Sequence, residues 1–204
     1  FYCAWPARNQ DQSVFLPSSV SVHETNPLQN RAFTMHYRIV FGALLISLGS
    51  TAFANPYLGG TAGKVDYSDD ELNSPTGFEI KLGGRVHRNL ALELSYIDFG
   101  DAEDDLEPVW EYSTDAVALA ALAVYPLSEV FELNIRVGGH HWDTQVHEAG
   151  FGKVADLSGT DLHYGVGMGF KPSEHLQLGL NYIRYEVKTG DINYPNASFN
   201  YYFK

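Results

Sequence analysis

Four histidines are the residues of this chain best suited to catalysis. They stand near a serine and an aspartate, which gives the set His140, His141, His147, His163, Ser158 and Asp161. A serine activated by a histidine and oriented by a carboxylate can act as the nucleophile in acyl transfer or lipid hydrolysis. No nucleophile motif surrounds the serine, and the spacings between the histidines indicate no such arrangement. We therefore expect no catalytic residue and no enzymatic activity.

Three of these histidines, His140, His141 and His147, together with Asp143, also have the residue types of a transition-metal site. The neighbouring pair His140 and His141 is the densest part of this set. Adjacent residues on a strand point to opposite faces, so these two imidazoles cannot easily share one ion. We predict no metal and no other cofactor.

Six charged residues have a more regular spacing. They are Glu79, Lys81, Arg85, Glu93, Glu132 and Arg136. They alternate with large apolar residues, as Glu79 and Lys81 do with Phe78, Ile80 and Leu82. A period of two is typical of a β-strand, whereas a helix brings its apolar residues back at three and four. The elements that position these charges are therefore predicted to be strands with one apolar and one polar face.

Alternation of this kind predicts eight strands. Their ranges are 55–65, 77–87, 90–99, 112–125, 130–142, 159–171, 176–187 and 197–204. The fourth is apolar on both faces, which leaves a helix as its alternative. Short turns alternate with long polar connections, namely 66–76, 100–111, 143–158 and the gap after 187. This pattern predicts an all-β fold, an eight-stranded antiparallel up-and-down transmembrane β-barrel. The alternative is a secreted sandwich whose apolar faces meet in a core.

The segment Met35–Ala54 has the order of a secretory signal peptide. A basic start is followed by an apolar run from Ile39 to Leu48 and by a small-x-small cleavage pattern at its end. We expect residues 55–204 to form the mature barrel, and residues 1–34 to be translated upstream sequence outside the fold. After the signal, no apolar run reaches the ~20 residues that a spanning helix needs, so a membrane-spanning form must be a closed barrel.

The composition limits the partners of the chain. Its formal net charge is −12, from 25 acidic against 13 basic residues, which argues against a nucleic-acid partner. The one cysteine, Cys3, lies outside the predicted mature chain, so no disulfide is expected there. The acid-rich stretches 66–71 and 98–111 allow two interpretations, a solvated surface or cation bridges to lipopolysaccharide phosphates.

If the apolar faces turn towards lipid, the six charged residues share a narrow interior. An isolated charge there would be costly, so we expect ion pairs that fill an eight-stranded lumen and close it. Aromatic residues at the strand ends are expected to form girdles at the membrane surfaces. These residues are Tyr57, Tyr96, Tyr125, Trp142, Tyr182, Tyr201 and Phe203.

Three stretches resemble the transmembrane domain of the outer-membrane protein A family. They are GTDLHYGVGMGFKPSEHLQLGLNYIRYEV from Gly159, LALELSYIDFG at residues 90–100 and the closing FNYYF. The resemblance implies a small barrel in the outer membrane of a Gram-negative bacterium, surrounded by outer-membrane lipid and lipopolysaccharide. The ending formed by Phe199, Tyr201 and Phe203 is similar to the signal read by the outer-membrane assembly machinery.

These expectations favour a non-enzymatic, monomeric barrel that serves envelope integrity or surface interaction through its external loops. A narrow channel for small solutes is the alternative, although the balanced charges of the interior argue against it. A lipid-modifying outer-membrane enzyme is the least favoured of the three.

Overall fold

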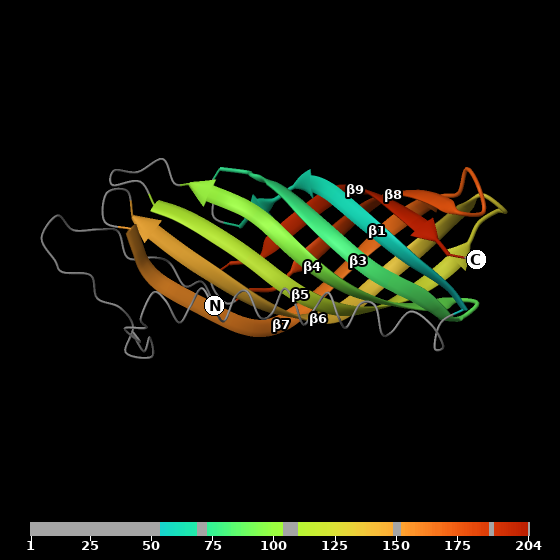
Figure 1. The fold of residues 1–204 in the computed structure, drawn as a ribbon, viewed down its shortest axis with the longest axis horizontal. Coiled ribbons are helices and arrows are strands. Elements are labelled where there is room, and N and C mark those ends of the chain that lie inside the picture. The colour runs from blue at the N-terminus through green and yellow to red at the C-terminus, as the bar shows by residue number, and fades with distance from the viewer. Residues whose placement is uncertain (1–53, 69–72, 104–109, 149–151, 188–189, 204) are drawn as a thin grey trace, which may run out of the picture. The chain divides into compact units, whose positions relative to one another are not determined.

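The alternating stretches form a closed antiparallel β-barrel (Figure 1). The computed structural model describes residues 54–68, 73–103, 110–148, 152–187 and 190–203, all within one compact unit, residues 40–204. The strands in these ranges are β1 (Ala54–Lys64), β2 (Asp66–Tyr67), β3 (Thr76–His87), β4 (Leu90–Glu103), β5 (Trp110–Pro126), β6 (Phe131–Glu148), β7 (Gly152–Phe170), β8 (Leu176–Tyr185) and β9 (Ile192–Tyr202). Within these ranges no helix has the length and apolar character needed to cross a bilayer.

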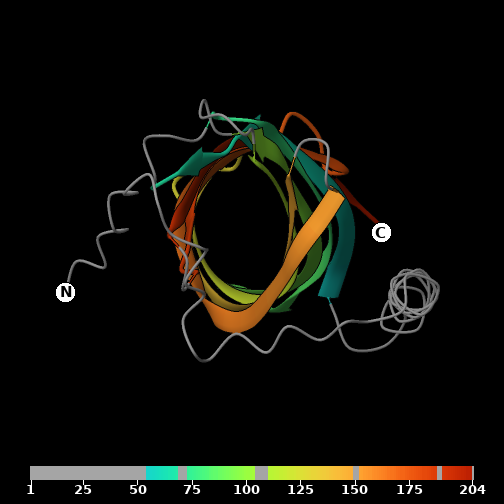
Figure 2. The same ribbon diagram turned by 90° about the vertical axis from the view of Figure 1, so that its left-hand side faces the viewer.

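The barrel closes because the last strand pairs with the first. Each long strand is antiparallel to the next, and β9 returns to β1, which completes the ring seen end-on in Figure 2. The short β2 continues β1 along β9 without a change of register, since Gly63 faces Asn196 and Asp66 faces Asn193. The ring therefore has eight strand positions, as predicted. Both the helix alternative for the fourth stretch and the sandwich alternative for the fold are wrong.

The two ends of the barrel differ. Short turns join β3 to β4, β5 to β6 and β7 to β8 at one end, which we call the turn end. The start of β1 and the end of β9 meet at the same end, where the Phe203 backbone N–H donates to the Pro56 carbonyl at 2.8 Å. The opposite end, on the left in Figure 1, is called the loop end.

The apolar faces point outward and the polar faces point inward. Ile80, Leu119, Ile135 and Leu180 are each about three-fifths exposed, with values of 58–62%. The six predicted charged residues lie on the inner face, and apart from Arg85 each of them is buried. A soluble protein would reverse this arrangement, because it gains stability by removing its apolar face from water.

Several strands extend further towards the loop end than the sequence predicted. The expected polar loop 143–158 is wrong, because β6 continues to Glu148 and β7 begins at Gly152. The expected loop 100–111 is shortened by β4 and β5, and the last strand begins at Ile192, five residues before the predicted 197. In these extensions both faces of the strands carry polar residues, so the contrast that marks a membrane strand is absent.

The predictions for the start of the chain concern residues outside the described part. Residues 1–34 and nearly all of the predicted signal segment, 35–53, lie there. The division into upstream sequence, signal peptide and barrel stays a prediction.

Candidate functional site

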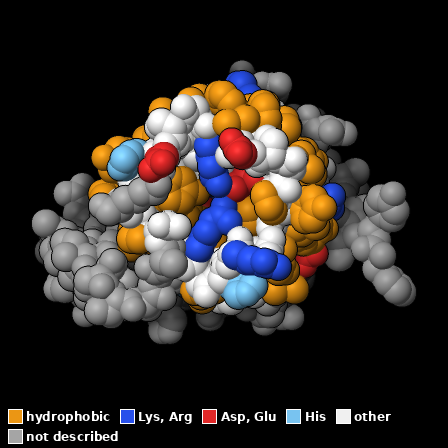
Figure 3. Space-filling model, turned by 90° about the vertical axis from the view of Figure 1, so that its right-hand side faces the viewer, with side chains coloured by type: hydrophobic (Ala, Val, Ile, Leu, Met, Phe, Trp, Pro, Cys, Tyr) orange, Lys and Arg blue, Asp and Glu red, His pale blue; other side chains and the backbone are white. Residues whose placement is uncertain are grey.

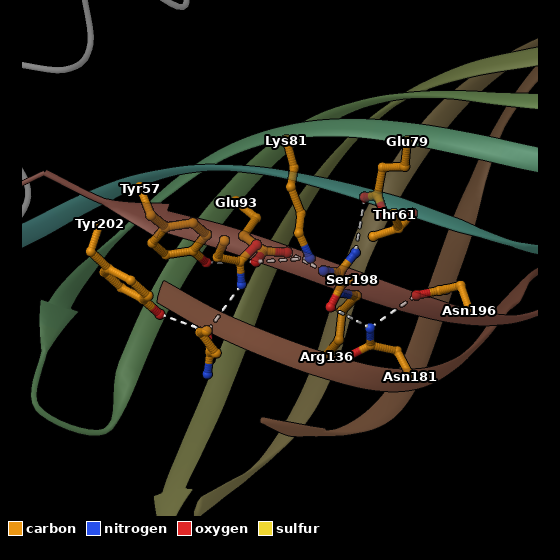
Figure 4. Close-up of polar contacts among 12 residues, drawn as sticks. Tyr57, Thr61, Glu79, Lys81, Glu93, Arg136, Asn181, Asn196, Ser198 and Tyr202 are labelled. Carbon is orange, nitrogen blue, oxygen red and sulfur yellow. Dashed lines mark hydrogen bonds and ion pairs between the residues drawn. The ribbon is translucent and has the colours of Figure 1, made fainter. Parts of the chain in front are cut away.

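The interior of the barrel is crossed by a buried ion cluster centred on Arg136. Its guanidinium donates from Nη1 to Glu79 Oε1 at 3.3 Å and from Nη2 to Glu93 Oε2 (Figure 4). Lys81 lies on the other oxygen of Glu93, with 3.7 Å between Nζ and Oε1. Arg136 belongs to β6 whereas its partners belong to β3 and β4, so the pair with Glu79 links strands that are not neighbours. These contacts tie opposite parts of the wall together.

Neutral side chains complete the hydrogen bonds of this cluster. The Tyr57 hydroxyl donates to Glu93 Oε1 at 2.5 Å, and the Thr61 hydroxyl donates to Glu79 Oε2 at 3.1 Å. A buried ion pair is tolerated only when its remaining lone pairs and protons are also satisfied, because taking the charges out of water is costly. Both carboxylates therefore have a cation and a hydroxyl donor.

A second cluster lies nearer the turn end and is centred on Glu132. Arg85 Nη2 donates to Glu132 Oε2 at 2.7 Å, and Lys171 Nζ donates to the same oxygen. Gln177 Nε2 donates to Glu132 Oε1 at 2.7 Å, and Gln177 Oε1 accepts in turn from Asn200 Nδ2 and the Tyr202 hydroxyl. Figure 3 shows the outer side of this end, where Lys and Arg side chains gather near the centre of the barrel and hydrophobic side chains surround them.

The structure thus brings the six predicted charged residues together, but in two clusters. Arg136, Glu79, Glu93 and Lys81 form one cluster, while Arg85 and Glu132 belong to the other. Between them lies a cavity of about 30 Å³, enough for about two water molecules. The neutral residues of the network were not predicted, and these are Tyr57, Thr61, Gln177, Asn181, Asn196, Ser198, Asn200 and Tyr202. They lie on β1, β8 and β9, and their alternation with outward-facing residues on these strands was the signal that could have found them.

An aromatic and aliphatic plug fills the interior on the loop-end side of the charges. Its fully buried members include Phe99, Trp142, Tyr185 and Tyr194. The rings of Phe99 on β4 and Tyr185 on β8 are 5.0 Å apart and meet edge to face, although their strands are not neighbours. This contact crosses the lumen. Salt bridges and packed rings therefore fill the interior at two successive levels.

Two of the four candidate histidines lie inside this region. His140 and His163 are at most 1% exposed, and their ring centroids are 5.7 Å apart. Their ring nitrogens have no hydrogen-bond partner among the described residues. Gly138 makes room for one of them, because a Cβ at that position would lie 2.6 Å from His163 Cε1. The two imidazoles are packed as rings of the interior, in contact with Tyr185.

The side chains of the proposed nucleophilic arrangement do not come together. In the described part of the chain, Ser158 is exposed and makes no hydrogen bond to a histidine, and Asp161 accepts from Trp142 Nε1 at 2.8 Å. His141 faces outward, opposite to His140, as the alternation predicted. Among the described residues no three His, Cys, Asp or Glu side chains lie close enough to hold a metal ion.

A barrel of this size with polar pairs inside and an apolar exterior has known relatives. Residues 40–203 match the family described as the outer membrane protein beta-barrel domain. The chain belongs to this family. It is therefore an integral outer-membrane β-barrel, and its apolar outer face is the lipid-facing surface of the family fold.

Solved structures of outer-membrane barrels share the fold of this family member. Ail, the attachment invasion locus protein of Yersinia pestis, is 18% identical with a TM-score of 0.52, covering 73% of this chain and 97% of that one. Neisserial surface protein A is 16% identical with a TM-score of 0.56, covering 72% and 97%. The N-terminal β-barrel domain of Pseudomonas aeruginosa OprF is 13% identical with a TM-score of 0.54 and the same coverage. A comparison with curated proteins gave no match.

The aromatic residues of this outer-membrane barrel follow the strand faces. Tyr125, Tyr182 and Tyr201 are about half to two-thirds exposed on the outside. Tyr57 and Trp142 are 3% and 2% exposed, so their predicted place in a girdle is wrong. Trp142 lies an even number of residues from Arg136 and therefore shares its inward face. Even near a strand end, a residue faces inward or outward according to the two-residue alternation of its strand.

The last strand presents its alternate residues to the outside. Phe199, Tyr201 and Phe203 are 54%, 49% and 48% exposed. Their backbones are held by the barrel, since Phe199 faces Gly60 on β1 and Leu178 on β8. A role of these three residues in recognition by the assembly machinery stays a prediction.

Proposed function

We propose that this chain is a closed, non-enzymatic barrel of a Gram-negative outer membrane, exported by a cleavable signal peptide. It acts as an anchor that presents its loop end for surface interaction and supports the envelope. The observation that carries the proposal is the filled interior, where Arg136 pairs with Glu79 and Glu93 and Phe99 meets Tyr185 across the lumen. If solutes cannot pass through the interior, the barrel can act on other molecules only through its exposed ends.

The alternatives have less support. A solute channel needs a continuous polar path, whereas the cavity between the ion clusters has a volume of about 30 Å³. A lipid-modifying enzyme needs a nucleophile in reach of a base. Ser158 is exposed and has no histidine partner among the described residues. The contacts proposed for the barrel are outer-membrane lipid and lipopolysaccharide around a monomer, with Phe199, Tyr201 and Phe203 read by the assembly machinery.

Cysteine labelling in intact cells tests whether the loop end is exposed at the cell surface. In a Cys3→Ser background, Ser158→Cys places a thiol at the loop end and Glu129→Cys places one at the turn end, both at exposed positions. A membrane-impermeant maleimide should label Ser158→Cys in intact Gram-negative cells, and Glu129→Cys only after the outer membrane is disrupted. Labelling of Glu129→Cys in intact cells, or protection of Ser158→Cys, would contradict the proposed orientation.

A further inference from the structure

One strand of the barrel extends beyond its neighbour at the loop end. β7 pairs with β8 from Phe170 up to His163, which faces Tyr185, and one further bond joins the Glu186 N–H to the Leu162 carbonyl at 2.9 Å. The remaining segment of β7, residues 152–161, pairs with β6 only. We call this segment the β7 overhang. On its other side, no strand of the described chain pairs with it.

The free side of the β7 overhang presents backbone hydrogen-bonding groups. Successive residues of a strand direct their N–H and C=O groups to alternate sides. Because the Leu162 carbonyl points towards β8, the backbone groups of Thr160, Ser158 and Asp156 point to the same side, where no described strand pairs with them. All three residues are exposed. A row of such groups is a template for pairing with another strand.

The surroundings of this edge are acidic. The extended parts of β5, β6 and β7 (residues 110–115, 141–148 and 152–161) contain one Lys or Arg, Lys153. Their acids are Glu111, Asp115, Asp143, Glu148, Asp156 and Asp161. Lys153 is already engaged with Asp156, and the Asp143 side chain is 58% exposed. Charge complementarity therefore favours a cationic partner.

We propose that the β7 overhang binds an extended basic peptide segment of another protein, which adds to the sheet as a further strand. The inference rests on the proposed function, because it names the class of partner that the displayed loop end takes. Backbone bonds to Asp156, Ser158 and Thr160 supply the affinity, as in other cases of strand addition. Lysine or arginine side chains of the partner face the acids of the extension.

The test uses the full barrel in detergent micelles and three synthetic peptides of about ten residues, the length of a typical strand. The first alternates Thr and Lys, the second alternates Thr and Glu, and the third is the Lys peptide with N-methyl groups on alternate residues. Fluorescence anisotropy measures binding. The Lys peptide should bind at least about tenfold more tightly than the other two, because they lack either the charge or the backbone donors.

Variants locate the binding edge. Ser158→Pro removes an N–H that no β6 bond uses, and proline is tolerated on such an edge. This variant should weaken binding of the Lys peptide about tenfold, whereas the matched Ser158→Ala variant keeps the backbone and should bind as the parent does. A heat-dependent shift in gel mobility verifies that each variant is folded.

Several outcomes would overturn the proposal. If the N-methylated peptide bound the parent as tightly as the Lys peptide, or if Ser158→Pro bound the Lys peptide as tightly as the parent does, the backbone edge would not be the binding site. If the Glu peptide bound as tightly as the Lys peptide, the acidic surroundings would not select the partner. If Ser158→Pro fails to fold, binding of the N-methylated peptide to the parent protein still tests the proposal. These results are independent of cysteine labelling and conductance, so failure of strand addition leaves the proposed closed anchor to be judged separately.

Discussion

Arg136 is the residue on which the interior depends most. It is 4% exposed and pairs with two carboxylates, each of which also accepts from a hydroxyl group. Its removal takes the cation from the buried carboxylate of Glu79 and leaves Glu93 with Lys81 alone. The exposed pair of Arg184 and Asp191 is a natural comparison, since these side chains are 40% and 31% exposed.

Arg136→Ala should lower the free energy of unfolding by about 3–5 kcal/mol, the cost of breaking a buried ion pair from one side. Arg184→Ala should lower it by less than about 1 kcal/mol, because water screens an exposed pair. Urea unfolding of the barrel in lipid vesicles, followed by tryptophan fluorescence, measures both. Equal stability of parent and Arg136→Ala would mean that the paired interior does not stabilise the barrel.

Two adjacent glycines offer a second comparison. At Gly138 a Cβ would clash first with the Leu119 carbonyl oxygen and would lie 2.6 Å from His163 Cε1, whereas at Gly139 the nearest atom is the Asp161 carbonyl oxygen at 3.8 Å. Gly138→Ala should therefore cost about 1–3 kcal/mol of stability through overpacking. Gly139→Ala should change it by less than about 0.5 kcal/mol. Similar losses at both positions would contradict the close packing around Gly138.

The sequence predicted the side of most interior residues but not their partners. Glu79, Lys81 and Arg136 alternate with large apolar residues, so a period of two assigns them to one face. That Arg136 reaches Glu79 across two intervening strands depends on barrel closure and strand stagger, which no local pattern contains. Trp142 faces inward although it lies near the predicted end of its strand, because alternation along β6 places it on the same face as Arg136.

At the scale of elements, the loop end is built by strands that continue beyond the stretch in which apolar and polar residues alternate. β5, β6 and β7 have 17, 18 and 19 residues, whereas β8 has 10. The sequence could not predict this extension, because residues 143–158 carry polar side chains on both faces. Pairing between β6 and β7 keeps residues 143–148 and 152–158 extended.

Hydrogen-exchange rates should differ between the paired β6 amides and the unpaired β7 amides of this extension. Amides of β6 between Asp143 and Val146 lie between β5 and β7 and should exchange slowly. The amides of Asp156, Ser158 and Thr160 face the free side and should exchange at least about tenfold faster. Mass spectrometry with electron-transfer fragmentation resolves these positions. Fast exchange throughout residues 143–158 would instead support the loop originally expected there.

At the scale of the whole molecule, the barrel is closed by two different kinds of contact. The ion clusters of Glu132 and Arg136 occupy the part nearer the turn end, and the plug containing Phe99 and Trp142 occupies the part nearer the loop end. An eight-stranded barrel is just wide enough for its own side chains to fill it. Its apolar outer face is the surface that meets the membrane.

Conductance in a planar lipid bilayer tests this closure most directly. Folded barrel, verified by its heat-dependent gel mobility, is inserted beside a water-filled porin that serves as the positive control. We predict that the current through membranes containing this protein stays at the level of protein-free leak. Stable, discrete conductance steps from the parent protein would contradict the sealed interior and would favour the channel alternative.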